Sequence, residues 1–220
     1  MKKMFGNCSS LTTLDLTHFD TSKVTYMGWM FAYCPSLELL NLSSFNTSKV
    51  VNMRIMFGNC ISLTTINLTH FDVSIVTDVG WMFHQCRNLT YLNLSNFNFK
   101  SATEFDYMFD GCKSLKSIDF TQFKTDNARN VRYMFRWCLS LTSIDLNNLD
   151  TSNVTLMTEM FLGCSSLESL DLSNFDTSKV INMNQMFRNC ENLKSLNLNN
   201  FNTLNVENME WMFYECYKLE

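Results

Sequence analysis

The cysteines of this chain recur at one fixed interval. They stand 26 residues apart each time, without insertion or deletion, at Cys8, Cys34, Cys60, Cys86, Cys112, Cys138, Cys164, Cys190 and Cys216. Each one ends a five-residue segment that begins with Met-Phe, as in Met4-Phe5 and Met160-Phe161. A signal that recurs at one spacing along a whole chain indicates a repeat protein, in which each unit buries its apolar side only against its neighbours.

Counting that Met as repeat position 1, the consensus of the unit is M-F-x-x-C-x-x-L-x-x-L-[DN]-L-x-x-F-[DN]-T-S-x-V-x-x-M-x-x. Its apolar residues are fixed by position, so stacked units would share one continuous core. We therefore predict a single solenoid domain over residues 1–220. Its eight full units are 4–29, 30–55, 56–81, 82–107, 108–133, 134–159, 160–185 and 186–211, and a partial ninth unit covers 212–220.

Each unit contains one strand pattern and one helix pattern. Apolar residues at positions 11 and 13, such as Leu14 and Leu16, alternate with polar residues, which is typical of a strand with one buried face. Apolar residues at positions 21 and 24, and in the next Met-Phe and Cys, have the spacing of a short helix. We predict an α/β solenoid of leucine-rich repeats, with a parallel β-sheet on one face and short helical or 3₁₀ segments on the other.

The chain has few of the usual turn residues, since it contains one Pro and six Gly. After the Phe at position 16, most units carry Asp or Asn followed by Thr and Ser, as in Asp20-Thr21-Ser22 and Asp176-Thr177-Ser178. These side chains accept hydrogen bonds from nearby backbone N–H groups. We predict that Asp, Asn, Thr and Ser build the turns in place of Gly and Pro.

Several classes of function are excluded by what the sequence lacks. The formal charge is −4 and no run of Lys or Arg occurs, so we predict no nucleic-acid partner. No apolar run reaches the roughly 18 residues of a membrane span, so we predict no membrane insertion within this chain. The only histidines are His18, His70 and His84, and the first two stand two turns apart, too far to share one site; no Gly-rich phosphate loop occurs. We predict no enzyme, no catalytic residue and no cofactor.

The cysteines have three possible roles: disulfide bonding, metal binding and core packing. Equivalent side chains of stacked units point the same way, which works against the dihedral angle of a disulfide, and nine is an odd number. No C-x-x-C or Cys/His cluster with zinc spacing occurs, so we predict no metal site. We interpret the cysteines as free thiols that pack as small apolar groups in the core.

The segment L-x-x-L-x-L is the leucine-rich repeat signature. Joined to M-F-x-x-C and F-D-T-S-x-V-x-x-M, it closely resembles the BspA-like leucine-rich repeat surface proteins of bacteria and some protozoa, over the whole chain. The resemblance implies a cell-surface or extracellular protein that binds host or neighbouring-cell molecules without catalysis. We expect less uniform geometry between about 99 and 132, because the chain departs from the pattern at Phe99-Lys100, Ala102, Phe105, Ala128 and Val131.

The ends of the chain bear on its location. Met1-Lys2-Lys3 runs straight into a repeat without an apolar segment, and no anchor follows the last repeat. We expect the chain to be a fragment of a longer surface protein. The alternative is a short cytoplasmic repeat protein, a scaffold for protein-protein assembly whose open ends pair with another chain.

The solvent side of the predicted sheet is the candidate binding surface. It presents repeat position 12, flanked by positions 10 and 14, and would contact a protein or a glycan. The alternative interpretation is that the position-12 side chains bond one another along the stack and only solvate the sheet. Consecutive Asp119, Asp145 and Asp171 suggest Ca²⁺ by their oxygen atoms, but no loop supplies further ligands, so no metal is predicted. The candidate ligand-binding residues are Asp15, Asn41, Asn67, Tyr91, Asn93, Asp119, Asp145, Asp171 and Asn197.

A second candidate surface is a row of aromatic residues at position 26. A regular helix would place this row on the outside, opposite the apolar stripe, where exposed aromatic side chains mark contact surfaces. In the alternative, the segment is not regular helix and the rings tuck between turns as core. The residues of this possible contact stripe are Trp29, Trp81, Tyr107, Tyr133 and Trp211.

Overall fold

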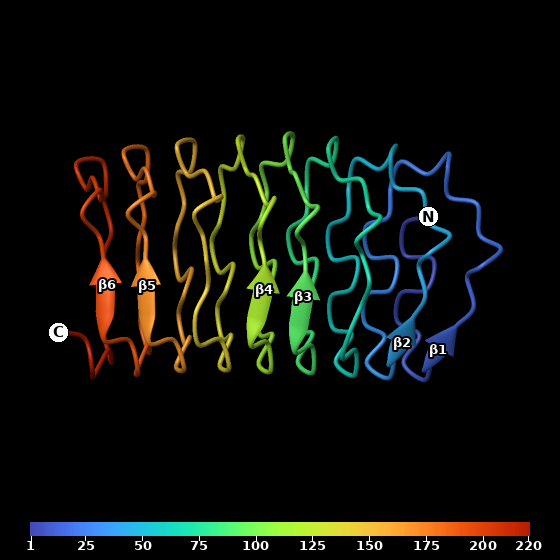
Figure 1. Cartoon of the computed structure of the whole chain (residues 1–220), viewed down its shortest axis with the longest axis horizontal. Coiled ribbons are helices and arrows are strands. Elements are labelled where there is room, and N and C mark those ends of the chain that lie inside the picture. The colour runs from blue at the N-terminus through green and yellow to red at the C-terminus, as the bar shows by residue number, and fades with distance from the viewer.

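The computed structural model describes residues 1–220 as a row of stacked turns (Figure 1). Each strand lies at repeat positions 10 to 12 or within them, and neighbouring strands pair in parallel as β1–β2, β3–β4 and β5–β6. The register is one repeat, so that Tyr91 lies opposite Ser117. The predicted short parallel strands are therefore confirmed. Their bounds are β1 Thr13–Leu14, β2 Leu39–Leu40, β3 Tyr91–Asn93, β4 Ser117–Asp119, β5 Ser169–Asp171 and β6 Ser195–Asn197.

The core is one continuous column of apolar side chains. Phe side chains at repeat position 2 stack ring on ring between successive turns, from Phe5 to Phe213, with centroids 5.5 to 5.8 Å apart. Those of the inner turns, such as Phe109, are fully buried. Offset-stacked aromatic rings attract one another beyond the effect of burial, so this column ties each turn to its neighbours.

The predicted helical segments are wrong, because the chain contains no helix. Residues at repeat positions 26 and 4 have positive φ, for example Trp29 at 62° and Tyr33 at 60°. A right-handed helix requires negative φ throughout, so it cannot pass through these residues. The segment is instead a series of tight turns, in which the Met30 N–H bonds to the Met27 carbonyl and the Ala32 N–H to the Trp29 carbonyl.

These tight turns free alternate N–H groups to bond to the next turn. Where the first unit meets the second, the bonds reach the carbonyls 25 residues further on, at 2.7 to 3.0 Å, and the donors are Met27, Trp29, Phe31 and Tyr33. The same pattern recurs from turn to turn along the stack, for example from Phe161 to Met186 at 2.9 Å. The Met-Phe segments therefore form the continuous hydrogen-bonded side of the solenoid, whereas strand pairing on the other side is interrupted.

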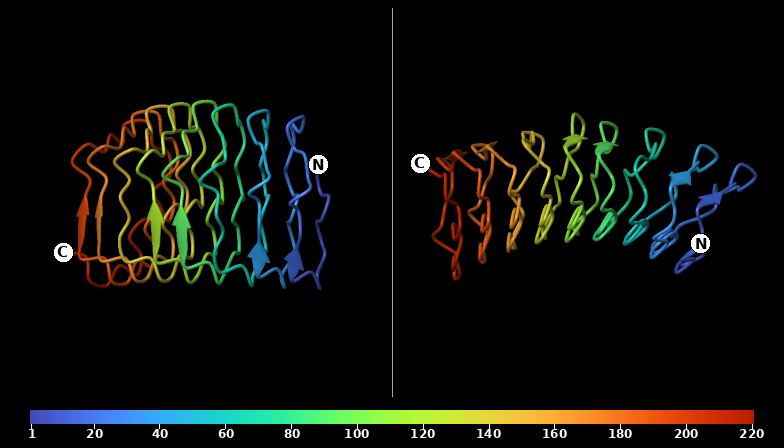
Figure 2. Two further views of the ribbon diagram at one scale, coloured as in Figure 1. Left: turned by 45° about the vertical axis from the view of Figure 1, so that its right-hand side comes forward. Right: turned by 90° about the horizontal axis from the view of Figure 1, so that it is seen from below.

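The stack is curved. Seen from below, the turns form a gentle arc, and the strands lie toward its outer side, where the turns spread apart (Figure 2). No strand forms at residues 65–67 or 143–145, which interrupts the row between β2 and β3 and between β4 and β5. The exposed sheet side is therefore a row of paired strands with gaps.

Polar side chains build the turns, as predicted. The Ser22 N–H bonds to Oδ1 of Asp20 at 2.9 Å, and Asp176 holds Ser178 in the same way. In most units a buried Thr follows the Asp or Asn at repeat position 17 and bridges adjacent turns. The Thr151 hydroxyl donates to the Asp176 carbonyl at 3.0 Å and accepts from the Asp176 N–H at 2.9 Å.

The middle of the chain departs from this pattern where the sequence does. Phe99 stands in the place of that Thr, and its ring packs edge-on against Phe97, Phe105 and Phe123 at 5.3 to 5.5 Å. An apolar cluster there replaces the hydroxyl bridge. The backbone bonds of the Met-Phe side continue, as from the Phe105 N–H to the Asn130 carbonyl at 3.0 Å.

The cysteine column lies next to the Phe column, and the prediction of a thiol core is confirmed for Cys34 to Cys190, which are buried. Each of these thiols donates to the carbonyl of the position-2 Phe in the preceding turn, as from Cys112 to Phe83 at 3.1 Å. Burial raises the pKa of Cys164 to about 12, so its thiol is uncharged at neutral pH. Cys8 is exposed and Cys216 is partly exposed.

Candidate interaction face

The solenoid has two long surfaces built from equivalent residues of successive turns. The sheet face consists of the side chains at repeat positions 10, 12 and 14, which are residues 13, 15 and 17 in the first unit. The turn face consists of positions 25, 26, 3 and 4, which begin at residues 28, 29, 32 and 33. The candidate ligand-binding residues lie on the first, and the candidate aromatic stripe lies on the second.

The position-12 side chains make the same hydrogen bond in every full unit. One oxygen atom of each accepts from the backbone N–H two residues further on, as Asp15 does from Thr17 at 3.0 Å. These bonds lie within one turn and do not run along the stack, although Asp171 is close enough to Asn197 for that side chain to contribute to lowering its pKa. The residues that share this geometry are Asp15, Asn41, Asn67, Asn93, Asp119, Asp145, Asp171 and Asn197.

The second carboxylate oxygen of each sheet-face Asp has no cationic partner. The sheet face carries four acidic side chains and no Lys or Arg, and none of the four joins an ion pair in the structure. The Thr121 hydroxyl and N–H lower the pKa of Asp119, and the Thr17 N–H and hydroxyl lower the pKa of Asp15. The sheet face is therefore anionic at neutral pH, through carboxylates that are open to solvent.

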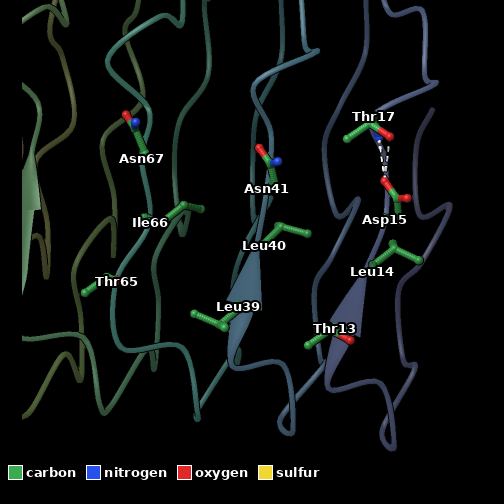
Figure 3. Close-up of a pocket in the computed structure, with 10 residues that line it drawn as sticks. All are labelled: Thr13, Leu14, Asp15, Thr17, Leu39, Leu40, Asn41, Thr65, Ile66 and Asn67. Atoms are coloured by element: carbon green, nitrogen blue, oxygen red, sulfur yellow. Dashed lines mark hydrogen bonds between the residues drawn. The ribbon is translucent and has the colours of Figure 1, made fainter.

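Apolar side chains are exposed on the same face. Leu39, on β2, is 60% exposed, and Tyr91, on β3, is 47% exposed. Leu39 extends toward the turn that carries Thr65, over a shallow hollow of about 710 Å³ (Figure 3). The side chains that line this hollow are Thr13, Leu14, Asp15, Thr17, Leu39, Leu40, Asn41, Thr65, Ile66 and Asn67.

Leu39 is not among the residues that the sequence singled out. The signal for it was present, since its repeat position otherwise holds Ser or Thr in every full unit except that of Tyr91. An apolar side chain at a position that faces solvent marks a possible contact point, because large apolar side chains at the centre of an interface supply much of its affinity.

The aromatic stripe on the turn face is neither an open row nor core. Tyr107 lies between Trp81 and Tyr133, with ring centroids 4.1 and 4.2 Å away, and the Arg136 guanidinium lies over Tyr107 and Tyr133. These three rings are half-buried and cover one another's faces. Faces that are already covered cannot stack on a sugar ring or on a partner's side chain.

The two ends of the stripe are less closely stacked. Trp29 lies 6.0 Å from Tyr33 and under the Lys3 ammonium group at 4.7 Å. Trp211, in the last turn, is 57% exposed and lies under Arg188 at 4.5 Å. The stripe therefore contains two separate aromatic groups besides the stacked central three.

Several charged side chains on or beside the turn face are paired with one another. Arg54 bonds to Asp106 at 2.8 Å and to Asp78 at 3.1 Å, across two turns of the stack. The Trp81 indole N–H donates to Asp106 as well, at 2.8 Å. These pairings satisfy a buried carboxylate within the chain.

A second network follows in the next turns. Asp110 is buried and lies 2.7 Å from Arg136 and 2.8 Å from the Nδ1 atom of His84, and Arg136 also reaches Glu159 at 3.2 Å. Burial alone would raise the pKa of Asp110, but the hydrogen bonds and charges of His84 and Arg136 outweigh it and lower the pKa. The turn face is therefore largely self-satisfied in its centre, in contrast to the sheet face.

Other candidate chemistry does not converge on one place. His70 bonds to the Leu42 carbonyl at 2.8 Å, and His84 belongs to the network above. No three His, Cys, Asp or Glu side chains come together in a way that could hold a metal ion. None of the structure's elements is a helix that could cross a membrane.

Comparison with known proteins identifies one family. The model of a family described as "Mycoplasma protein of unknown function, DUF285" matches residues 1–119, 62–145 and 129–220. No curated protein matches the chain.

Three solved leucine-rich repeat structures are similar. One from Bacteroides ovatus is 20% identical with a TM-score of 0.41, covering 100% of this chain and 68% of its own. The leucine-rich repeat protein of T. pallidum is 22% identical with a TM-score of 0.43, covering 76% of this chain and 81% of its own. A leucine-rich cell surface protein of Faecalibacterium prausnitzii is 17% identical with a TM-score of 0.28, covering 90% and 76%. At these scores the three indicate no function for this chain.

Proposed function

We propose that this chain, which belongs to the family described as Mycoplasma protein of unknown function, DUF285, is a non-catalytic binding module that contacts a protein or a glycan through its sheet face. The observation that carries the proposal is the contrast between the two long surfaces. The turn face pairs its buried carboxylates and stacks its central rings within the chain, and its exposed aromatic side chains, such as Tyr33 and Trp137, lie outside those stacks. The sheet face leaves carboxylates without cations and exposes Leu39 and Tyr91.

Such a face suits binding by many shallow contacts. The rigid core holds the repeated side chains in one register, so a partner that fits meets several of them at once without ordering the surface first. Tyr91 and Leu39 are the expected centres of affinity, because aromatic and other large apolar side chains carry much of the binding energy of an interface. The surrounding Ser, Thr and Asn side chains would supply hydrogen bonds.

We further propose that the module belongs to a cell-surface protein engaged in adhesion. The support is the resemblance of its repeat to the BspA-like surface proteins. The alternative, a cytoplasmic scaffold that assembles through the aromatic stripe, has weaker support because Trp81, Tyr107 and Tyr133 cover one another's faces.

The test combines a screen with two matched variants. The chain is applied to arrays of host matrix proteins, mucins and glycans, and a hit is then measured with the double variant Tyr91→Ala and Asp119→Ala. The control is Tyr214→Ala with Asp176→Ala, which removes the same two residue types from exposed positions off the sheet face. We expect loss of binding in the first variant alone. Absence of any ligand, or equal binding by both variants, would contradict the proposal.

A further inference from the structure

The sheet face differs between its two halves. Toward the N-terminus it exposes two large apolar side chains, Leu39 and Tyr91, and holds the hollow that spans β1, β2 and the following turn, with Asp15 as its single carboxylate. Toward the C-terminus it is acidic, because Asp119, Asp145 and Asp171 occupy position 12 of three consecutive turns. The two halves lie on the same side of the solenoid, so a single partner can span both.

From this arrangement, and resting on the proposed function, we propose that the partner is a protein segment in extended conformation that carries one large apolar side chain and a neighbouring run of basic residues. Its apolar side chain would enter the hollow beside Leu39. Its basic side chains would lie along Asp119, Asp145 and Asp171. Charge complementarity of this kind sets the orientation and the association rate of a partner.

The carboxylates are suited to recruit cations. Their first oxygen is held by the backbone N–H two residues on, which fixes the side chain, and the second has no cationic partner. Hydrogen bonds from Thr121 and Ser173 lower the pKa of Asp119 and Asp171. No Lys or Arg of the chain pairs with any of the three, so a partner's cation would not displace an existing ion pair.

The spacing of the turns sets the spacing expected in the partner. Paired turns lie about 4.8 Å apart and the turns between β2 and β3 are unpaired, so the Leu39 turn and the Asp119 turn are separated by at least about 14 Å. An extended chain rises about 3.3 Å per residue, which places the basic run at least about four residues from the apolar side chain. Nucleic acids and anionic glycans are disfavoured as partners, because the sheet face has no Lys or Arg to neutralise their charge.

The probe is a set of synthetic peptides with a Leu four to six residues before a stretch of alternating Lys and Ser. Two companions of each peptide replace Lys by Glu or Leu by Ser. We expect at least one Lys peptide to bind, its Glu companion not to bind, and its Ser companion to bind about tenfold more weakly, since a large apolar side chain contributes on that scale. Binding of the Lys peptide should weaken steeply as salt concentration rises.

The decisive variant is Asp119→Asn, Asp145→Asn and Asp171→Asn together. Asn keeps the local bond, because Asn41 and Asn67 accept the same N–H at the same repeat position. We expect about tenfold weaker binding of the Lys peptide, since three exposed charge pairs each contribute modestly.

The matched control makes the same charge change off the sheet face, at position 17, with Asp72→Asn, Asp150→Asn and Asp176→Asn. These side chains are exposed and hold the same kind of local bond. We expect binding of the Lys peptide to be unchanged. An equal loss in both triple variants, or no binding of any Lys peptide by the unaltered chain, would overturn the inference. If the arrays still return a ligand that needs Tyr91, the proposed function stands and only the chemistry of the partner is wrong.

Discussion

The buried Thr column offers a sharp test of what holds successive turns together. Thr151 is 1% exposed, and its hydroxyl both donates to and accepts from the backbone of Asp176 in the next turn. Val has nearly the shape of Thr but lacks the hydroxyl, so Thr151→Val removes both bonds without opening a cavity. The Asp176 N–H and carbonyl would then lose their partner on that side.

The magnitude follows from these two bonds. A hydrogen bond within a protein contributes about 1 kcal/mol net, so we expect Thr151→Val to lower the free energy of unfolding by about 2 kcal/mol. For a chain of this length the midpoint of thermal unfolding should fall by about 4–8 °C. The matched control is Thr142→Val, since Thr142 is exposed and its hydroxyl makes no hydrogen bond within the chain.

Circular dichroism during heating, together with urea titration, measures both variants against the unaltered chain. The reasoning would be refuted if Thr151→Val unfolded within about 0.5 kcal/mol of the unaltered chain, which is the range of ordinary surface substitutions. It would equally be refuted if Thr142→Val cost as much as Thr151→Val. Either result would mean that apolar packing alone joins the turns.

Three further predictions concern the core and the turn face. In a thiol-reagent titration of the folded chain at pH 8, Cys8 should react fast, and Cys34 to Cys190 only after denaturation, because burial raises their pKa and excludes the reagent. Gly163→Ala should cost about 1–3 kcal/mol in urea titration, since Gly163 has a φ of 74° and an added Cβ would overlap the Trp137 ring; in a Trp137→Ala background the cost should shrink. The lowered pKa of Asp110 predicts stability that is present above the ordinary carboxyl value of about 3.9 and is lost as pH falls through the lowered value, so Asp110→Asn should flatten that part of the stability profile.

The repeat, the core and the strands could be predicted from the sequence because each depends on residues fixed by position. Met, Phe and Cys recur at one spacing, and a side chain that recurs in every unit must stack on its copies, as Phe109 does on Phe83. The turn chemistry could also be predicted, because a segment such as Asp20-Thr21-Ser22 is typical of turns. Because neighbouring units are alike, the pattern within one unit also predicts the contacts between units.

The helices could not be excluded from the sequence. The spacing of Val24, Met27, Met30 and Phe31 fits a helix, and it also fits a series of tight turns that points the same residues inward. What decides between them is the hydrogen-bond partner: a helix bonds within itself, whereas these turns give alternate N–H groups to the next unit. The hydrogen bonds between units cannot be read from a single repeat. The tight turns that allow them place Trp29 and Tyr33 at positive φ, which side chains of this size rarely adopt.

The candidate site was read from the sequence only in outline. The polar row at position 12 could be predicted to face solvent, but its local bonds depend on backbone geometry, as with Asp119 and the Thr121 N–H. The mutual stacking of Trp81, Tyr107 and Tyr133 was also not predictable, because it follows from the tight turns that replace the helix. From the sequence alone, the sheet face was the first candidate and the aromatic row the second.

Hydroxyl-radical footprinting of the complex with a ligand from the arrays tests the central claim most directly. Four exposed side chains report on the two surfaces: Leu39 and Tyr91 on the sheet face, and Tyr33 and Trp137 on the turn face. The account predicts that ligand protects Leu39 and Tyr91 from oxidation and leaves Tyr33 and Trp137 as reactive as in the free chain. Protection of Tyr33 and Trp137 with Leu39 and Tyr91 still reactive would contradict it.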